Sequence, residues 1–113
     1  MSIPPYLPKS EVTLIKLKRD TVLSRVYANT EDKIGGWFMN SDDPRKLSPK
    51  ELKEKYALPK EPKYYCDVVL NKGTVLRIGH ANKVSDWGLG GGVQFDALGE
   101  YVGKFSKDYL IEN

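Results

Sequence analysis

The sequence predicts one compact α+β domain that is rich in strands and carries one main helix. Several short runs of β-branched and aromatic residues are bounded by turn residues, and only one segment carries helix start and stop signals. The content of 40% hydrophobic and 11% aromatic residues is typical of a folded globule. Residues 1–8 contain three of the seven prolines. We therefore expect residues 1–10 to form an extended arm or a junction to an upstream domain, and residues 11–113 to form a single domain.

Six segments have the apolar alternation or clustering of strands. The first two are separated by a polar turn at Arg19-Asp20, and the third and fourth by Asn71-Lys72-Gly73, which is typical of a hairpin turn. The expected strands are Val12–Lys18, Val22–Tyr27, Tyr65–Leu70, Thr74–Ile78, Val93–Phe95 and Tyr101–Phe105. A turn containing Gly99 precedes the last of them, and residues 107–113 form a charged tail.

The main helix is predicted from about Ser48 to Tyr56. Ser48 is a suitable N-cap, Pro49 suits the first helical position, and Glu51 completes a capping box. Leu52 and Tyr56 are four residues apart and give the helix a narrow apolar stripe, so we expect it to pack on the sheet. The prolines at positions 59 and 62 prevent its continuation.

Composition excludes several kinds of site. Eighteen basic and fifteen acidic residues give a net charge of +3, which predicts no nucleic-acid partner but suits an anionic small molecule. Cys66 and His80 are the only residues of their types, so neither a disulfide nor a zinc site of the usual kind is expected. We expect Cys66 to be a small buried core residue. No stretch is apolar for long enough to span a bilayer, and no membrane partner is expected.

The segment from Trp87 to Phe95 contains four of the ten glycines, with an indole before them and Gln94 after them. Glycine lets the backbone turn through positive φ and lets a ligand approach the main chain. A dinucleotide-binding fingerprint needs a helix after the glycines, but a strand follows here, and no Gly-Lys-Ser/Thr ends the loop as in a P-loop. We interpret the segment as a pocket wall whose N–H groups are available to anionic oxygens.

Three further features are candidate ligand contacts. Arg25 shares one strand face with Leu23 and Tyr27, and either a ligand phosphate or a structural salt bridge explains an arginine there. The large aromatic side chains near glycines either clamp a flat ring or pack in the core, and core packing is favoured for Phe38. Gln94 either holds a ribose hydroxyl or amide or faces solvent on an edge strand. The aromatic candidates are Trp37, Phe38 and Trp87.

Taken in order, these motifs resemble the necrotizing-toxin (TNT) type of NAD glycohydrolase domain, found at the C-termini of bacterial polymorphic toxins. The resemblance covers residues 25–95. The matching motifs are Arg25-Val26-Tyr27, Gly36-Trp37-Phe38, Ala57-Leu58-Pro59, Tyr64-Tyr65, Gly79, Trp87-Gly88 and Gly90-Gly91-Gly92-Val93-Gln94-Phe95. Two positions depart from the pattern. The family has a histidine after the tyrosine of the fourth motif, where this chain has Tyr65 or Cys66, and a glycine where it has Ala28. Membership of a sister group, or of the wider ADP-ribosyltransferase-like fold, therefore stays open.

The resemblance implies an ADP-ribosyltransferase-like fold and cleavage of the nicotinamide–ribose bond of NAD or NADP, with no metal or other cofactor. It implies that Arg25 binds the pyrophosphate, that Tyr27 or Trp37 lies against nicotinamide or its ribose, and that Gln94 binds the ribose or orients the water. The substrate-binding set implied is Gly36, Trp37, Phe38, Tyr65, Trp87, Gly90, Gly91 and Gly92. It also implies a cognate immunity protein as partner. The chain would then be the C-terminal domain of a secreted toxin that acts in the cytoplasm of a target cell.

Three other functions remain as alternatives. An ADP-ribosyltransferase would transfer ADP-ribose to a macromolecule with the help of a glutamate near the ribose; Glu100 is a candidate for that role, while Gln94 favours hydrolysis. A toxin ribonuclease would need several acid–base side chains, and the single histidine makes it a weaker alternative. A non-catalytic binding module would use the aromatic and glycine-rich surface for a protein partner.

Overall fold

The computed structural model describes residues 13–98 and 102–113. The arm expected at residues 1–10, the turn around Gly99 and the first residues of two expected strands, Val12 and Tyr101, lie outside these ranges. The strands are β1 (Thr13–Lys16), β2 (Thr21–Tyr27), β3 (Trp37–Asn40), β4 (Tyr64–Leu70), β5 (Val75–His80), β6 (Val93–Asp96), β7 (Lys104–Phe105) and β8 (Tyr109–Leu110). The helices are α1 (Asp43–Lys46), α2 (Pro49–Tyr56) and the 3-10 turn η1 (Thr30–Asp32).

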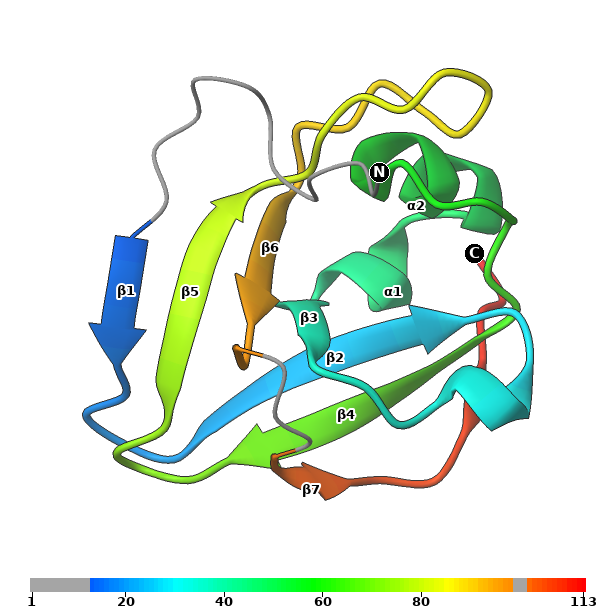
Figure 1. Cartoon of the computed structure of the whole chain (residues 1–113). Coiled ribbons are helices and arrows are strands. Elements are labelled where there is room, and N and C mark those ends of the chain that lie inside the picture. Colours follow the sequence, from blue (N-terminus) through cyan, green and yellow to red (C-terminus); the bar gives the residue numbers. More distant parts are fainter. Residues whose placement is uncertain (1–12, 99–101) are drawn as a thin grey trace.

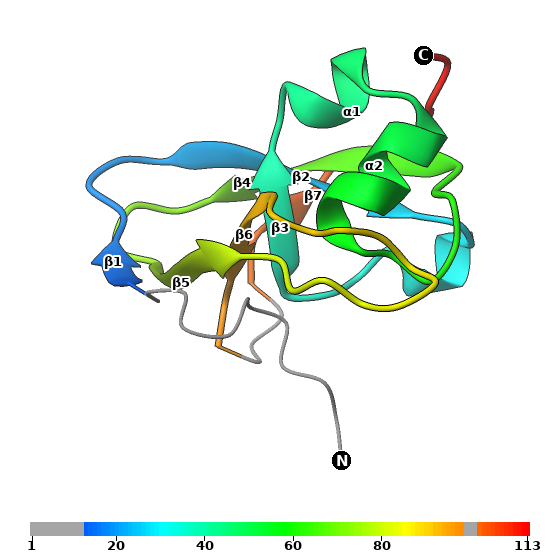
Figure 2. The same ribbon diagram turned by 90° about the horizontal axis from the view of Figure 1, so that it is seen from above.

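All strands belong to one antiparallel sheet in the order β1-β5-β6-β3-β2-β4-β7, and β8 also pairs with β4. The sheet bends at β3, so that β1, β5 and β6 run steeply to β2 and β4 in Figure 1. Figure 2 shows α1 and α2 on the same side of the sheet, with the loop of residues 81–92 beside α2. This architecture confirms the strand-rich α+β class with one main helix.

Two apolar clusters hold the fold together. The first takes buried residues from both halves of the bent sheet, among them Leu23, Phe38, Cys66 and Leu76. Cys66 is fully buried, and its burial raises the pKa of the thiol, as expected for a core residue. The second cluster lies between α2 and the sheet: Leu52, Tyr56, Met39 and Ala81, with Val26 packed against them. The apolar stripe of α2 therefore has the packing role that its spacing predicts.

The capping signals of α2 act as predicted. The Ser48 hydroxyl accepts a hydrogen bond from the Glu51 backbone N–H at 3.1 Å, and the Glu51 carboxylate accepts from the Ser48 N–H at 3.0 Å. The helix ends at Tyr56, and its C-cap residue Ala57 has a left-handed backbone with φ of 50°. This turn directs Leu58 and Pro59 toward a cavity described below. Among the described residues, no helix is long and apolar enough to cross a membrane.

Four elements were not predicted, and two expected strands are shorter. η1 is a three-residue 3-10 turn, β3 is a four-residue strand behind two glycines, α1 is a single turn, and β8 lies in the charged tail. The two strands among them depend on strand partners: β3 pairs with β2 and β6, and β8 pairs with Tyr64 and Tyr65 of β4. The first expected strand ends at Lys16 instead of Lys18. The last expected strand is reduced to Lys104–Phe105, because Gly103 has φ of 101°, which extended backbone does not adopt.

Candidate functional site

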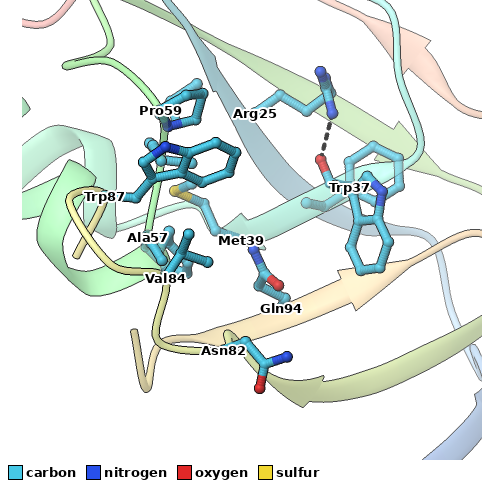
Figure 3. A pocket seen from close by; sticks show the side chains of 13 residues that line it. Arg25, Trp37, Met39, Ala57, Pro59, Asn82, Val84, Trp87 and Gln94 are labelled. Carbon is cyan, nitrogen blue, oxygen red and sulfur yellow. Dashed lines mark hydrogen bonds between the residues drawn. The ribbon is translucent and has the colours of Figure 1, made fainter. Parts of the chain in front are cut away.

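A cavity of about 340 Å³ opens between the end of α2, the loop of residues 81–92 and the strands β2, β3 and β6. Most of its wall is apolar, and it includes both tryptophans of the chain. Figure 3 shows Trp87 beside Pro59 on one side and Trp37 on the other, with Met39 and Gln94 between them. Trp87 is 40% exposed. The side chains of Trp37, Phe38, Trp87, Arg25 and Gln94, all candidates from the sequence, line this single cavity.

Gln94 supplies the cavity with an unsatisfied acceptor. It lies on β6, opposite Gly79 of β5, and its neighbour Phe95 packs on the other side, against the first core cluster. The side-chain oxygen Oε1 is buried and has no hydrogen-bond partner among the described residues. A buried acceptor without a partner costs about 1–3 kcal/mol. A ligand hydroxyl or amide that donates to this oxygen would recover that free energy.

Arg25 holds the loop that leads into β3. Its Nε donates to the Lys33 carbonyl at 2.7 Å, its Nη1 to the Trp37 carbonyl at 2.7 Å and its Nη2 to the Asp32 carbonyl at 2.9 Å (Figure 3 marks the bond to Trp37). A Cβ at Gly35 would lie 2.7 Å from the guanidinium carbon, so a larger residue there would displace the guanidinium from its carbonyl acceptors. Burial lowers the pKa of the guanidinium.

Among the described residues, Arg25 does not form the salt bridge that was considered for it. Its guanidinium bonds backbone carbonyl oxygens instead of a carboxylate. The three bonds engage three of its five N–H groups. The remaining two N–H groups have no acceptor in the described part of the chain, while the side chain lines the cavity. Arg25 therefore both positions Trp37 and offers donors to an anion.

Tyr27 lies beside a second, smaller cavity rather than in the first. It is only 4% exposed, and its hydroxyl donates to the Asp108 carboxylate, which also pairs with Lys33 at 3.3 Å. Burial and this hydrogen bond raise the pKa of the Tyr27 hydroxyl. The ring stacks on Tyr64 with centroids 6.0 Å apart. The hydroxyl is thus committed to Asp108, and contact of this group with nicotinamide has no support in the geometry.

The glycine-rich loop packs against the end of α2. The N–H groups of Gly90, Gly91 and Gly92 donate to the carbonyls of Glu54, Ala81 and Lys55 at 2.9–3.0 Å. Two of these carbonyls belong to the last turn of α2, which has no intrahelical donors for them. The three glycines do not line the cavity, and their N–H groups are engaged, so the anion-binding role predicted for them finds no support here.

Two other residues of the predicted set also lie outside the cavity wall. Tyr65 stacks on Tyr109 at 5.1 Å and lies under Arg45. The Gly36 carbonyl accepts from the Ala97 N–H at 2.9 Å, which ties the start of β3 to the end of β6. His80 is exposed at the end of β5, and Glu100 lies outside the described residues.

Other wall residues were not proposed as site residues. Met39 and Val84 contribute apolar surface, and Asn82 is a buried polar residue on the loop that carries Trp87. Leu58 and Pro59 belong to the motif Ala57-Leu58-Pro59, for which the sequence predicted no role in the site. Within the described residues, no group of three or more His, Cys, Asp or Glu side chains could hold a metal ion.

The fold resembles two solved structures. The first is Tne2 in complex with Tni2, with a TM-score of 0.75 and 13% identity over 94% of this chain and 97% of that one. The second is Rhs1-CT in complex with its cognate immunity protein RhsI1, with a TM-score of 0.59 and 18% identity over 88% of this chain and 81% of that one. No protein-family model matches the sequence, and no curated protein matches it significantly. At these identities the likeness establishes a shared fold.

Proposed function

We propose that this domain is an NAD(P)⁺ glycohydrolase of an ADP-ribosyltransferase-like fold that acts as a toxin by depleting cellular NAD. The observation that carries the proposal is the buried Oε1 of Gln94, which has no hydrogen-bond partner in the described part of the chain and lies in a cavity flanked by two indoles and an arginine. Indole faces suit a flat pyridinium ring, and a guanidinium suits a pyrophosphate. The motifs that resemble the TNT type of NAD glycohydrolase contain these same residues.

The chemistry needs little from the protein. Water attacks the anomeric carbon of the nicotinamide ribose, and the carbon–nitrogen bond breaks with its electron pair going to the pyridinium nitrogen. Nicotinamide leaves as a neutral molecule, and the proton of the water goes to solvent. The leaving group carries its positive charge beforehand and needs no general acid. The transition state resembles the oxocarbenium ion of glycoside hydrolysis.

The roles of individual residues follow from this chemistry. The Gln94 oxygen would accept a hydrogen bond from a ribose hydroxyl or from the attacking water, and so stabilise the developing positive charge. The indoles of Trp37 and Trp87 would hold the ring in place and exclude solvent. The two N–H groups of Arg25 that have no acceptor among the described residues would bind the pyrophosphate. No step requires a metal or another cofactor.

The shared fold supports a toxin with a protein inhibitor. One of the two similar structures is a complex with a cognate immunity protein, and the other is a complex of Tne2 with Tni2. We propose that this domain also has a cognate immunity protein. We further propose that residues 11–113 form the catalytic unit at the C-terminus of a secreted toxin and that it acts in the cytoplasm of the target cell.

The test is NAD cleavage by the purified domain, with nicotinamide and ADP-ribose both quantified. We expect the two products in equal amounts, and a loss of about a hundredfold or more in kcat for Gln94→Ala without a change in folding. Val93→Ala is the matched control, because Val93 is the neighbouring residue on β6, is exposed and lines neither cavity.

Three outcomes would contradict the proposal in different ways. If the folded domain leaves NAD intact, it is not a glycohydrolase. If nicotinamide appears only when a macromolecular acceptor is present, with ADP-ribose found on that acceptor, the domain is an ADP-ribosyltransferase instead. Wild-type turnover by Gln94→Ala would remove Gln94 from the site.

A further inference from the structure

A second cavity of about 230 Å³ lies next to the first. Its walls come from the end of β2, from η1 and its preceding residue Asn29, and from the segment that follows α2. The two cavities share four wall residues: Arg25, Val26, Leu58 and Pro59. They are therefore neighbouring compartments on either side of a common strip.

The second compartment is built into the fold. The Lys63 N–H donates to the Tyr27 carbonyl at 3.0 Å, which ties the segment after α2 to the end of β2. Pro62 is buried in its wall, and Arg25 bonds the Asp32 carbonyl on the opposite side. A backbone hydrogen bond and a charged one thus join segments that form the walls of this compartment.

Size favours a ligand that occupies both compartments. Pockets for ligands of ordinary size have volumes of roughly 300–1,000 Å³. The first compartment, at about 340 Å³, is near the lower end of that range, and the second, at about 230 Å³, is below it. Each is suited to one half of a dinucleotide, and the pair to the whole molecule.

The charge of Arg25 indicates that the group linking the two halves of the dinucleotide binds at this residue. This guanidinium lines both compartments and keeps two N–H groups without acceptors among the described residues. An anionic bridge between two halves of a ligand would meet those donors. Lys60 adds a second, exposed cation at the smaller compartment.

The smaller compartment has the side chains that a nucleoside needs. Prolines and Leu58 supply apolar contact for a base, the Asn29 amide can both donate and accept at a base edge, and the Asp32 carboxylate can accept from sugar hydroxyls. Asn29 precedes η1 but forms no side-chain capping hydrogen bond, so its amide is not needed there. The Gln94 acceptor lies only in the first compartment.

We infer that the smaller compartment binds the nucleoside half distal to the bond that is cleaved, the adenosine 5′-phosphate part of the dinucleotide, with Asn29 and Lys60 as specificity residues. This inference rests on the proposed function. Binding energy from a distant half of a substrate is used to position its reacting half, so a truncated substrate should be cleaved less efficiently.

The experiment compares NAD with nicotinamide mononucleotide, which lacks the distal half but contains the same scissile bond. We expect kcat/KM for the truncated substrate to be at least about tenfold lower in the wild type. We expect the double variant Asn29→Ala, Lys60→Ala to lose about tenfold in kcat/KM for NAD and several-fold less for the truncated substrate. Lys50→Ala is the matched control, because Lys50 is an exposed lysine on α2 that lines neither compartment.

Equal kcat/KM for the two substrates, or an equal loss for both in the double variant, would overturn the inference. Binding of adenosine 5′-phosphate, measured by calorimetry, separates this failure from failure of the proposed function. If the folded domain cleaves neither substrate but binds adenosine 5′-phosphate, and the double variant weakens that binding, the compartment stands and the glycohydrolase proposal falls. If adenosine 5′-phosphate does not bind, the compartment is not a nucleotide site.

Discussion

The packing of the glycine-rich loop on α2 can be tested by adding one methyl group. A Cβ at Gly88 would lie 2.6 Å from the Glu54 carbonyl oxygen and 2.8 Å from the Lys53 carbonyl oxygen. Both are backbone atoms of a helix and cannot move aside as a flexible side chain does. Gly91 offers the comparison, because a Cβ there meets nothing within 4 Å, although its φ is 92°.

The expected cost of Gly88→Ala follows from what must move. Inserting a methyl group into a packed contact costs typically about 1–3 kcal/mol. If the loop shifts away instead, the bonds from the Gly90 and Gly92 N–H groups to the last turn of α2 weaken, at about 0.5–1.5 kcal/mol each. Either route lowers the free energy of unfolding by about 1–3 kcal/mol. Gly91→Ala pays only for its backbone conformation, at about 1 kcal/mol.

Thermal unfolding followed by circular dichroism measures the difference. In a domain of this size, 1 kcal/mol shifts Tm by roughly 4–8 °C. We expect Gly88→Ala to lower Tm by about 5–20 °C, and by more than Gly91→Ala, which should lower it by about 5 °C. Equal shifts for the two variants, or a wild-type Tm for Gly88→Ala, would refute the packing argument. If a stable Gly91→Ala variant no longer cleaved NAD, the N–H groups of the glycine-rich loop would have to be considered ligand contacts again.

Two further predictions concern the residues around the smaller cavity. The hydrogen bond from Tyr27 holds the pKa of the Asp108 carboxyl below its ordinary value of 3.8, so its stabilising effect is complete above that value and is lost as the pH falls through the lowered one. We expect Tyr27→Phe to unfold at lower denaturant concentration than the wild type at neutral pH, with the difference shrinking in acid; a difference independent of pH would contradict this. Arg25→Lys keeps the charge but cannot reach three carbonyls from one planar group, and we expect it to lower the free energy of unfolding by roughly 2–3 kcal/mol. Denaturant titration checks this value, and a wild-type midpoint would show that the three bonds contribute nothing.

Local signals were enough to predict the elements that carry their own start and stop residues. Helix α2 begins at its Ser48 cap and ends at Tyr56, and the turn at Gly73 has the positive φ that a hairpin glycine provides. Strand β3 was missed because four residues behind two glycines give no period, and its strand geometry comes from pairing with β2 and β6. The β8 pair was missed for the same reason, since Tyr109 becomes a strand residue only by lying beside Tyr65.

The candidate site was partly predictable for a related reason. Trp37, Trp87 and Gln94 are unusual neighbours of glycines in the sequence, and they do line one cavity. The role of the glycines could not be predicted from the sequence. A glycine is needed where a ligand lies close to the backbone and equally where a helix does, so the residue type does not distinguish the two. The second cavity could not be predicted from the sequence, because Asn29 and Lys60 lie far apart in it and are ordinary loop residues. They come together only when β2 and the segment after α2 are joined.

The placement of the two tryptophans has a practical consequence. They are the only two in the chain, and both line the larger cavity, Trp87 partly exposed and Trp37 held by the carbonyl bond from Arg25. The intrinsic indole fluorescence of the protein therefore originates entirely from that wall. Changes in emission intensity or wavelength would report occupancy directly, without a label, so that titration with a small molecule or a protein inhibitor can be followed on the unmodified domain.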